Sequence, residues 1–159
     1  MIFLTVGTIY PFDRLIKAID NAIKFRIIKE PVFAQIGKTD FKPEYMQYAK
    51  MLNGNEFNEK ISVADYIISH AGVGSIITAL DNKKPLLVMP RLRKFKEHVN
   101  NHQIALAQKF EQLGHILVAY NIHELPDKLE QLKTFVPKPR ENQAQAVANR
   151  IRSFLQSIE

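Results

Sequence analysis

The sequence predicts an α/β fold, a Rossmann-like parallel sheet with helices on both faces. Short apolar runs of four to six residues alternate along the chain with helical segments of 8–16 residues, which is the pattern of βαβ units. Three of the six glycines, Gly7, Gly37 and Gly72, fall just after predicted strands. Ligands of such sheets bind beyond the carboxyl ends of the strands, so these glycine turns are expected to line one cleft.

The first half of the chain alternates clearly, with one ambiguous stretch. Residues 2–6 are rich in β-forming side chains and end at Gly7. Residues 11–25 place apolar side chains on one helical face, with Pro11 suited to a first turn. Residues 31–36 read as a second strand that Gly37 ends, and residues 41–57 fit a short helix or a strand equally well.

The second half follows a sharper alternation. A strand is expected at residues 66–69, a helix at 73–80 and a strand at 85–89. The segment 98–113 reads as a helix stopped by Gly114, followed by a strand at 116–119. Two helices with polar faces are expected at residues 122–135 and 141–158.

Length and composition indicate one ordinary globular domain over residues 1–159. The chain has 46% hydrophobic and 24% charged residues and no cysteine, which excludes disulfides, thiolate metal sites and cysteine nucleophiles. No apolar run approaches the ~20 residues of a membrane span, so the protein is expected to be soluble or peripheral. The helices in the last ~40 residues either pack on this core or dock on a partner.

The net charge of +6 permits an anionic partner. The densest basic stretch, residues 91–96, reads as a solvated loop in preference to a binding patch. No basic motif interleaved with aromatic residues supports nucleic-acid binding, which is therefore not expected.

The stretch from His70 to Ser75 has the composition of an anion-binding turn. A helix begins there, and the free N–H groups of a first helical turn suit phosphate oxygens. Gly72 and Gly74 lack a Cβ atom that would block a diphosphate, and the Ser75 hydroxyl adds a donor. Gly-x-Gly alone does not separate such a site from a merely tight connection, so both interpretations remain open.

The absence of several well-known motifs excludes some classes of nucleotide-binding and catalytic site. The full dinucleotide pattern, the Walker phosphate loop and the serine-hydrolase elbow are all absent. His98 and His102 have the i, i+4 spacing of metal ligands, but a third ligand is lacking and a polar helix start is the preferred interpretation. Asn101, His102 and Gln103 suit sugar hydroxyls, which need neutral donors and acceptors, but on these residues alone a helix N-terminus with polar caps is the preferred interpretation.

Five stretches of the chain form one further set of motifs: FLTVGT, QIGKTD, EFNEKISVADYIISHAGVGSIITAL, KKPLLVMPR and EHVNNHQIALAQKF. The last three contain the run S-H-A-G-x-G-[ST], followed by P-x-x-x-x-P and H-Q at a specific spacing. Together they resemble the C-terminal, nucleotide-sugar-binding domain of the family 28 glycosyltransferases over roughly residues 1–119. Within that family they are most similar to single-domain half-enzymes, the PssE-like proteins of bacterial exopolysaccharide synthesis and the eukaryotic single-domain UDP-N-acetylglucosamine transferase subunit.

The resemblance implies half of a two-domain GT-B architecture with a UDP-sugar donor site and no obligatory metal or other cofactor. Phe57 and nearby backbone would pack against the uracil, and Thr78 would face the ribose. The diphosphate, loop and sugar positions implied by the resemblance are Gly7, Thr8, Gly37, His70, Ala71, Gly72, Val73, Gly74, Ser75, His102 and Gln103. Thr78 and Asn101 stand where relatives often carry acidic residues, which leaves the donor sugar open.

The resemblance also implies a partner, because 159 residues leave no room for an acceptor-binding domain. It predicts inverting transfer from a UDP-sugar to a lipid-linked saccharide acceptor, with a separate membrane-associated subunit that binds the acceptor. The chain would then be cytoplasmic and peripheral at the inner face of the cell membrane. His70 is the one candidate base within the chain. The alternatives are a regulatory nucleotide-binding domain and a non-catalytic activator without nucleotide affinity.

Overall fold

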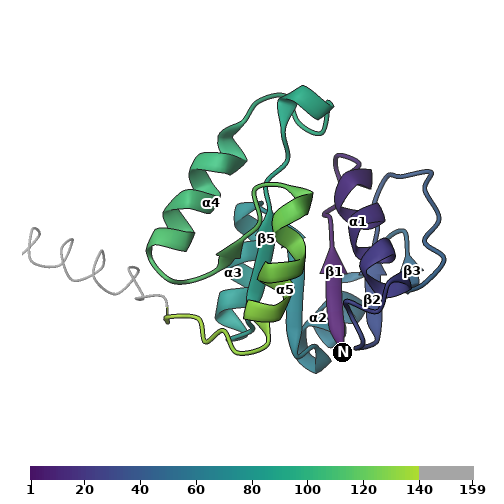
Figure 1. The fold of residues 1–159 in the computed structure, drawn as a ribbon, viewed down its shortest axis with the longest axis horizontal. Helices are drawn as coiled ribbons and strands as arrows, with labels where there is room; N and C mark the ends of the chain where they lie inside the picture. Colours follow the sequence, from purple (N-terminus) through teal and green to yellow (C-terminus); the bar gives the residue numbers. More distant parts are fainter. Residues whose placement is uncertain (140–159) are drawn as a thin grey trace, which may run out of the picture.

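The computed structural model describes residues 1–139 as one parallel sheet with helices on both faces (Figure 1). The described sheet has six strands in the order β3-β2-β1-β4-β5-β6, and every neighbouring pair is parallel. The strands are β1 Ile2–Thr5, β2 Val32–Gln35, β3 Gln47–Ala49, β4 Tyr66–His70, β5 Leu86–Met89 and β6 Leu117–Val118. The predicted Rossmann-like α/β class is confirmed.

The helices form two layers that sandwich the sheet. Those of the described chain are α1 Asp13–Lys24, α2 Gly54–Val63, α3 Val73–Asp81, α4 His102–Gln112 and α5 Leu125–Leu132, with 3-10 turns η1 Arg93–Phe95 and η2 Ile122–Glu124. Helices α1 and α5 pack on one face of the sheet, and α2, α3 and α4 pack on the other. No helix within residues 1–139 is long and apolar enough to cross a membrane.

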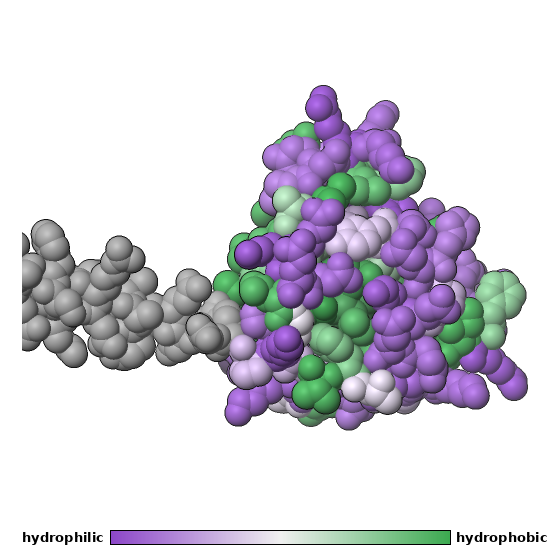
Figure 2. Space-filling view, turned by 60° about the vertical axis from the view of Figure 1, so that its left-hand side comes forward, coloured by the Kyte–Doolittle hydropathy of each residue, from purple (hydrophilic) through white to green (hydrophobic). Residues whose placement is uncertain are grey.

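The central strands are buried on both faces, as expected for a parallel sheet covered by helices. Leu4 and Ile68 join the apolar layer beneath α1 and α5, whereas Phe3 and Ile67 join the layer beneath α2, α3 and α4. Hydrophilic side chains cover most of the face shown in Figure 2, with apolar atoms in patches between them. Strands β1 and β4 pair from Ile2 opposite Tyr66 to Thr5 opposite Ser69, so the turns that follow them emerge side by side.

Two predicted helices differ from those observed. Helix α4 begins at His102 instead of residue 98, because the side-chain oxygens of Asn100 and Asn101 bind backbone N–H groups and keep residues 98–101 irregular. In place of the expected helix over residues 122–135, the chain forms a 3-10 turn followed by the shorter α5. The Asn121 side-chain oxygen caps the 3-10 turn by accepting the N–H groups of His123 and Glu124.

The ambiguous stretch 41–57 contains a strand and the start of a helix. Its middle forms the short edge strand β3, and α2 begins three residues before Phe57. The expected strands at residues 2–6, 31–36, 66–69, 85–89 and 116–119 all overlap observed strands to within a few residues. The helix expected over residues 141–158 lies outside the described residues.

Candidate functional site

The glycine turns after β1 and β2 pack directly against each other at the carboxyl edge of the sheet. Gly7 and Gly37 have φ angles of 74° and 62°, in the left-handed region that favours glycine. A β-carbon at Gly37 would lie 2.5 Å from the Gly7 carbonyl oxygen. Both glycines are therefore required by backbone conformation and by the close approach of these two turns.

The His70 side chain, at the end of β4, fills the space between the turns at Gly7 and Gly72. A β-carbon at Gly7 would lie 2.9 Å from His70 Cε1. A β-carbon at Gly72 would collide with His70 Nε2 and lie 2.9 Å from Cδ2. Gly72 has an ordinary extended conformation, with φ −86° and ψ 135°, so the imidazole alone makes glycine necessary there.

Gly74 differs from Gly72 in its surroundings. A β-carbon built on Gly74 would meet no heavy atom within 4 Å. The sequence left open whether the space at both glycines serves a ligand or only a tight connection. In the structure, the imidazole of His70 occupies the space at Gly72, and only the space at Gly74 is open.

His70 is neutral at physiological pH. Burial, reinforced by the positive charge of Arg91, lowers the pKa of His70 from 6.5 to about 3. The Ser69 hydroxyl lies 3.2 Å from His70 Nδ1 and donates its proton to the Thr5 carbonyl oxygen at 2.8 Å. Nδ1–H therefore donates to Ser69, and Nε2 is left as an acceptor. A neutral imidazole with so low a pKa is a weak base, which argues against His70 as the catalytic base.

The N-terminus of α3 has no side-chain cap within residues 1–139. Its N-cap is Gly72, no described side chain accepts its first N–H groups, and no acidic residue lies in its first turn. Helix α2 shows the usual alternative, because Asn53 and Glu56 form a capping box with hydrogen bonds of 3.0 and 2.9 Å. The positive end of α3, where Val73 is 53% exposed, is thus available to an external anion.

The other residues predicted to line the donor site near α3 differ in burial and in hydrogen bonding. Ala71 is fully buried, and Ser75 is half-buried in the first turn. The Thr78 hydroxyl donates to the Gly74 carbonyl oxygen at 2.9 Å, which leaves it able only to accept from a ribose hydroxyl. Phe57 is half-buried in α2, edge-on to Phe3 with ring centroids 5.4 Å apart. Contacts of Thr78 with ribose and of Phe57 with uracil stay predictions.

The start of α4 forms one rim of the same edge. The His98 ring lies 5.0 Å from the Tyr10 ring and 4.6 Å from the His102 ring, so three rings bridge the loop after β1 to α4. His98 precedes the helix, and the idea that His98 and His102 share one helical face is wrong. No three His, Cys, Asp or Glu side chains within residues 1–139 come together as a possible metal site.

Gln103 and His102 differ sharply in accessibility. His102 is exposed, and its Nδ1 lies 2.5 Å from the Asn100 side-chain oxygen. Gln103 is only 3% exposed, and its side-chain oxygen accepts the Arg91 backbone N–H at 3.0 Å. In this structure Gln103 holds the loop after β5 in place, and its contact with a donor sugar stays a prediction.

Arg91 is a functional candidate that sequence reasoning missed. The stretch 91–96 was expected to be solvated, and its residues 93–96 are exposed, but Arg91 is only 3% exposed. Its terminal nitrogen donates to the carbonyl oxygens of Val6 and Tyr10 at 2.5 Å each. Burial lowers the pKa of Arg91 to about 10, so the guanidinium remains protonated at neutral pH.

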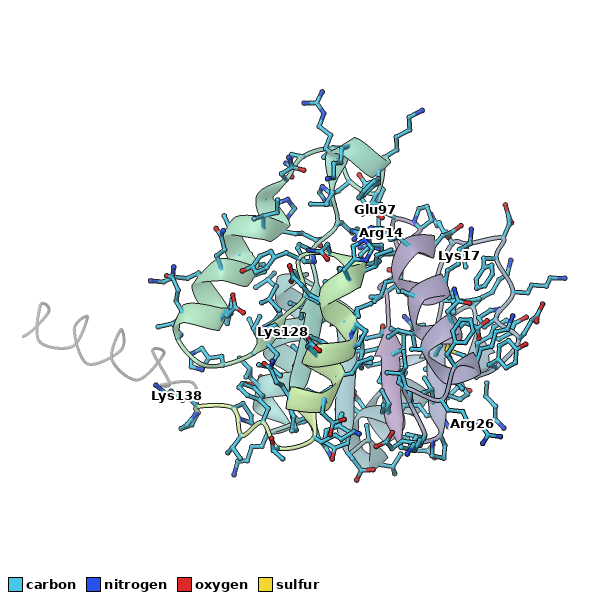
Figure 3. The ribbon with its side chains drawn as sticks, in the orientation of Figure 1. Arg14, Lys17, Arg26, Glu97, Lys128 and Lys138 are labelled. Carbon is cyan, nitrogen blue, oxygen red and sulfur yellow. The ribbon has the colours of Figure 1, made fainter. Side chains whose placement is uncertain are left out.

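Glu97, in the same loop, is also buried and forms an ion pair with Arg14. The two side chains point toward one another at the end of the sheet (Figure 3). Arg14 donates to both carboxylate oxygens, at 2.8 and 2.9 Å, and the Leu92 N–H donates to one of them at 2.9 Å. This bidentate pair fixes the loop after β5 to the first turn of α1.

The order of the parallel strands defines an α/β domain of the Rossmann-like class, with the uncapped helix α3 beside two glycine turns at the carboxyl edge of its sheet. The model of the glycosyltransferase family 28 C-terminal domain matches residues 1–158, and the chain belongs to this family.

Curated relatives with detectable sequence similarity carry the name UDP-N-acetylglucosamine transferase subunit ALG13. The human protein is 32% identical over 124 residues, which cover 72% of this chain and 10% of the human one. The Yarrowia lipolytica protein is 25% identical over 173 residues, which cover 98% of this chain and 86% of the relative. The chain thus spans a tenth of the human relative and 27% of the Candida albicans one.

Solved structures share the fold. The solution structure of ALG13 aligns with a TM-score of 0.59 at 20% identity, covering 94% of this chain and 93% of that one. The crystal structure of Acinetobacter baumannii MurG aligns with a TM-score of 0.63 at 18% identity, covering 95% of this chain but 49% of that one. This chain therefore aligns with about half of the MurG chain.

Proposed function

We propose that this chain is the donor-binding subunit of an inverting UDP-sugar glycosyltransferase that acts on a lipid-linked acceptor in polysaccharide synthesis. A separate membrane-associated subunit binds the acceptor and brings the chain to the inner face of the cell membrane. Membership of family 28 and the sequence similarity to relatives named as UDP-N-acetylglucosamine transferase subunits support this assignment.

The uncapped N-terminus of α3 carries the proposal. Its free N–H groups, the partial positive charge of the helix and the open space at Gly74 form a receptor for a diphosphate. The turn at Gly7 and Thr8, one strand away, faces the same edge of the sheet. Helix α2, by contrast, satisfies its own N-terminus with Asn53 and Glu56, so the two helices on this face of the sheet differ in what their N-termini can accept.

In the proposed reaction, an acceptor hydroxyl oxygen attacks the anomeric carbon of the donor sugar. The new carbon–oxygen bond forms on the face opposite to the breaking bond, and UDP leaves with the electron pair. The amides at the start of α3 stabilise the negative charge that develops on the departing diphosphate. The hydroxyl proton passes to a base on the partner subunit, because His70 is buried, neutral and weakly basic in this chain.

Titration calorimetry of the full chain with UDP, and with ADP as the control, tests the donor site. We expect UDP to bind and ADP to bind at least ~10-fold more weakly. Equal affinity for both nucleotides would contradict the uridine assignment. Absence of binding to either would contradict a donor site in this chain and favour an activator role. UDP-glucose, UDP-galactose, UDP-glucuronate and UDP-N-acetylglucosamine, titrated in turn, then identify the sugar.

A further inference from the structure

Arg91 is a buried cation without an ion-pair partner in the described chain. Within residues 1–139 no carboxylate lies within ion-pair distance of its guanidinium, and the carboxylate of nearby Glu97 is engaged by Arg14. The Arg91 Nε atom is buried and has no hydrogen-bond partner among the described residues. Buried charges in proteins are normally paired, so an unpaired one calls for an external anion or a specific structural need.

The position of Arg91 connects it to the turn at Gly7. Its side chain reaches back from the end of β5 to the carbonyl oxygens of Val6 and Tyr10, and it also stacks over the Phe12 ring at 5.1 Å. The loop between these carbonyls therefore wraps around the guanidinium. The amides of Thr8 and Ile9 in this loop donate no hydrogen bond to any described residue, and both residues are exposed.

We propose that Arg91 is a positioning residue for the diphosphate of the bound nucleotide. Its guanidinium holds the 6–10 loop in the shape that presents the Thr8 and Ile9 amides. Arg14 and Arg91 share the single negative charge of Glu97, and the positive charge left over attracts the diphosphate to this loop. This inference rests on the proposed nucleotide-binding function. It adds to the glycine turns a residue that does not itself touch the ligand, because its side chain is almost fully enclosed.

Two ligands separate this role from a general structural one. Uridine has the base and ribose of UDP but no phosphate, so the loop should matter for UDP alone. We expect Arg91→Met to weaken UDP binding at least ~10-fold and uridine binding less than ~2-fold. Arg91→Lys keeps the positive charge and a donor group and should recover most of the UDP affinity. Arg91→Gln keeps N–H donors but has no charge, and it should not recover the affinity.

A matched control removes an arginine elsewhere. Arg26 is exposed and lies at the opposite end of the molecule (Figure 3), so Arg26→Met changes the net charge equally and should leave UDP affinity within ~2-fold. Unchanged UDP affinity in Arg91→Met, or an equal loss for UDP and uridine, would overturn the proposal.

Backbone order parameters from NMR relaxation provide a readout that does not depend on nucleotide binding. Arg91→Met should lower the order parameters of the Thr8 and Ile9 amides from the rigid range of about 0.85 to below about 0.6, while leaving α2 and α5 unchanged, which also establishes that the variant is folded. Unchanged order parameters at Thr8 and Ile9 would overturn the role of Arg91 in holding the loop. If the unmodified chain binds no UDP, the nucleotide function fails independently, and the relaxation experiment alone decides whether Arg91 holds the loop.

Discussion

Replacement of Gly72 by alanine should destabilise the fold through a single contact. The new β-carbon would lie 2.9 Å from Cδ2 of His70 and still closer to Nε2, whereas carbon atoms pack at ~3.5–4.0 Å, so the imidazole must move by roughly 1 Å. Overpacking of this kind costs about 1–3 kcal/mol, and the displaced ring also loses its 3.2 Å contact with Ser69. We expect a loss of about 2–3 kcal/mol in the free energy of unfolding.

Gly74→Ala is the matched control, two residues away in the same turn. Its β-carbon would meet no heavy atom, and alanine is favoured over glycine in a helix by up to ~1 kcal/mol, so stability should be unchanged or slightly raised. The same methyl group would enter the space that we assign to the diphosphate. UDP affinity should therefore fall at least ~10-fold in Gly74→Ala, without a loss of stability.

Urea denaturation of both variants, in the native and His70→Ala backgrounds, isolates the imidazole contact. Without the ring, the cost of Gly72→Ala should fall to about 1 kcal/mol or less, the ordinary cost of alanine at an N-cap. An undiminished cost in the His70→Ala background would refute the steric explanation. A Gly72→Ala variant as stable as the native chain would refute it as well.

Three other perturbations test separate parts of the structure. The folded-state pKa of His70, about 3, lies below its unfolded value of 6.5, so its stabilisation is complete above pH 6.5 and is lost as pH falls from 6.5 toward 3. Between pH 7.5 and pH 5.5, the free energy of unfolding should fall by about 1.3 kcal/mol more in the native chain than in His70→Asn. An equal fall in both proteins would contradict the burial of His70. Asn53→Ala removes the cap of α2 and should cost about 1 kcal/mol by urea denaturation, with UDP affinity unchanged. Glu97→Gln leaves the Arg14 guanidinium without its carboxylate and should cost about 3–5 kcal/mol, part of which Arg14→Met restores in the double variant; no restoration would argue against the pair.

The glycine turns and the central strands could be predicted from sequence because their signals are local. Residues 2–6 and 66–69 are apolar runs that end near Gly7 and Gly72, and burial on both faces of a parallel sheet produces such runs. Strand β3 could not be distinguished from a helix, because its Gln47, Tyr48 and Ala49 lie at an exposed edge where no burial pattern develops.

The burial of Arg91 and the role of Gly72 depend on residues far away in the sequence. The carbonyl groups of Val6 and Tyr10, which accept hydrogen bonds from Arg91, lie 85 and 81 positions earlier in the sequence. No local sequence pattern predicts these contacts. Likewise, the sequence indicates that Gly72 is needed but not whether a ligand or a protein side chain occupies its missing Cβ position. The structure assigns that space to His70, two residues before it.

The pairing of β1 with β4 constrains when the site can exist during synthesis. Ser69 of β4 lies 64 residues after Thr5 of β1, its partner in the sheet, and Arg91 emerges later still. At translation rates of ~5–20 residues per second, the turn at Gly72 is synthesised several seconds after the turn at Gly7. A nascent chain that ends before β5 would expose the unpaired edge of β4 and would lack Arg91. If the proposed site is correct, UDP should bind only to ribosome-bound chains long enough to include β5 and Arg91.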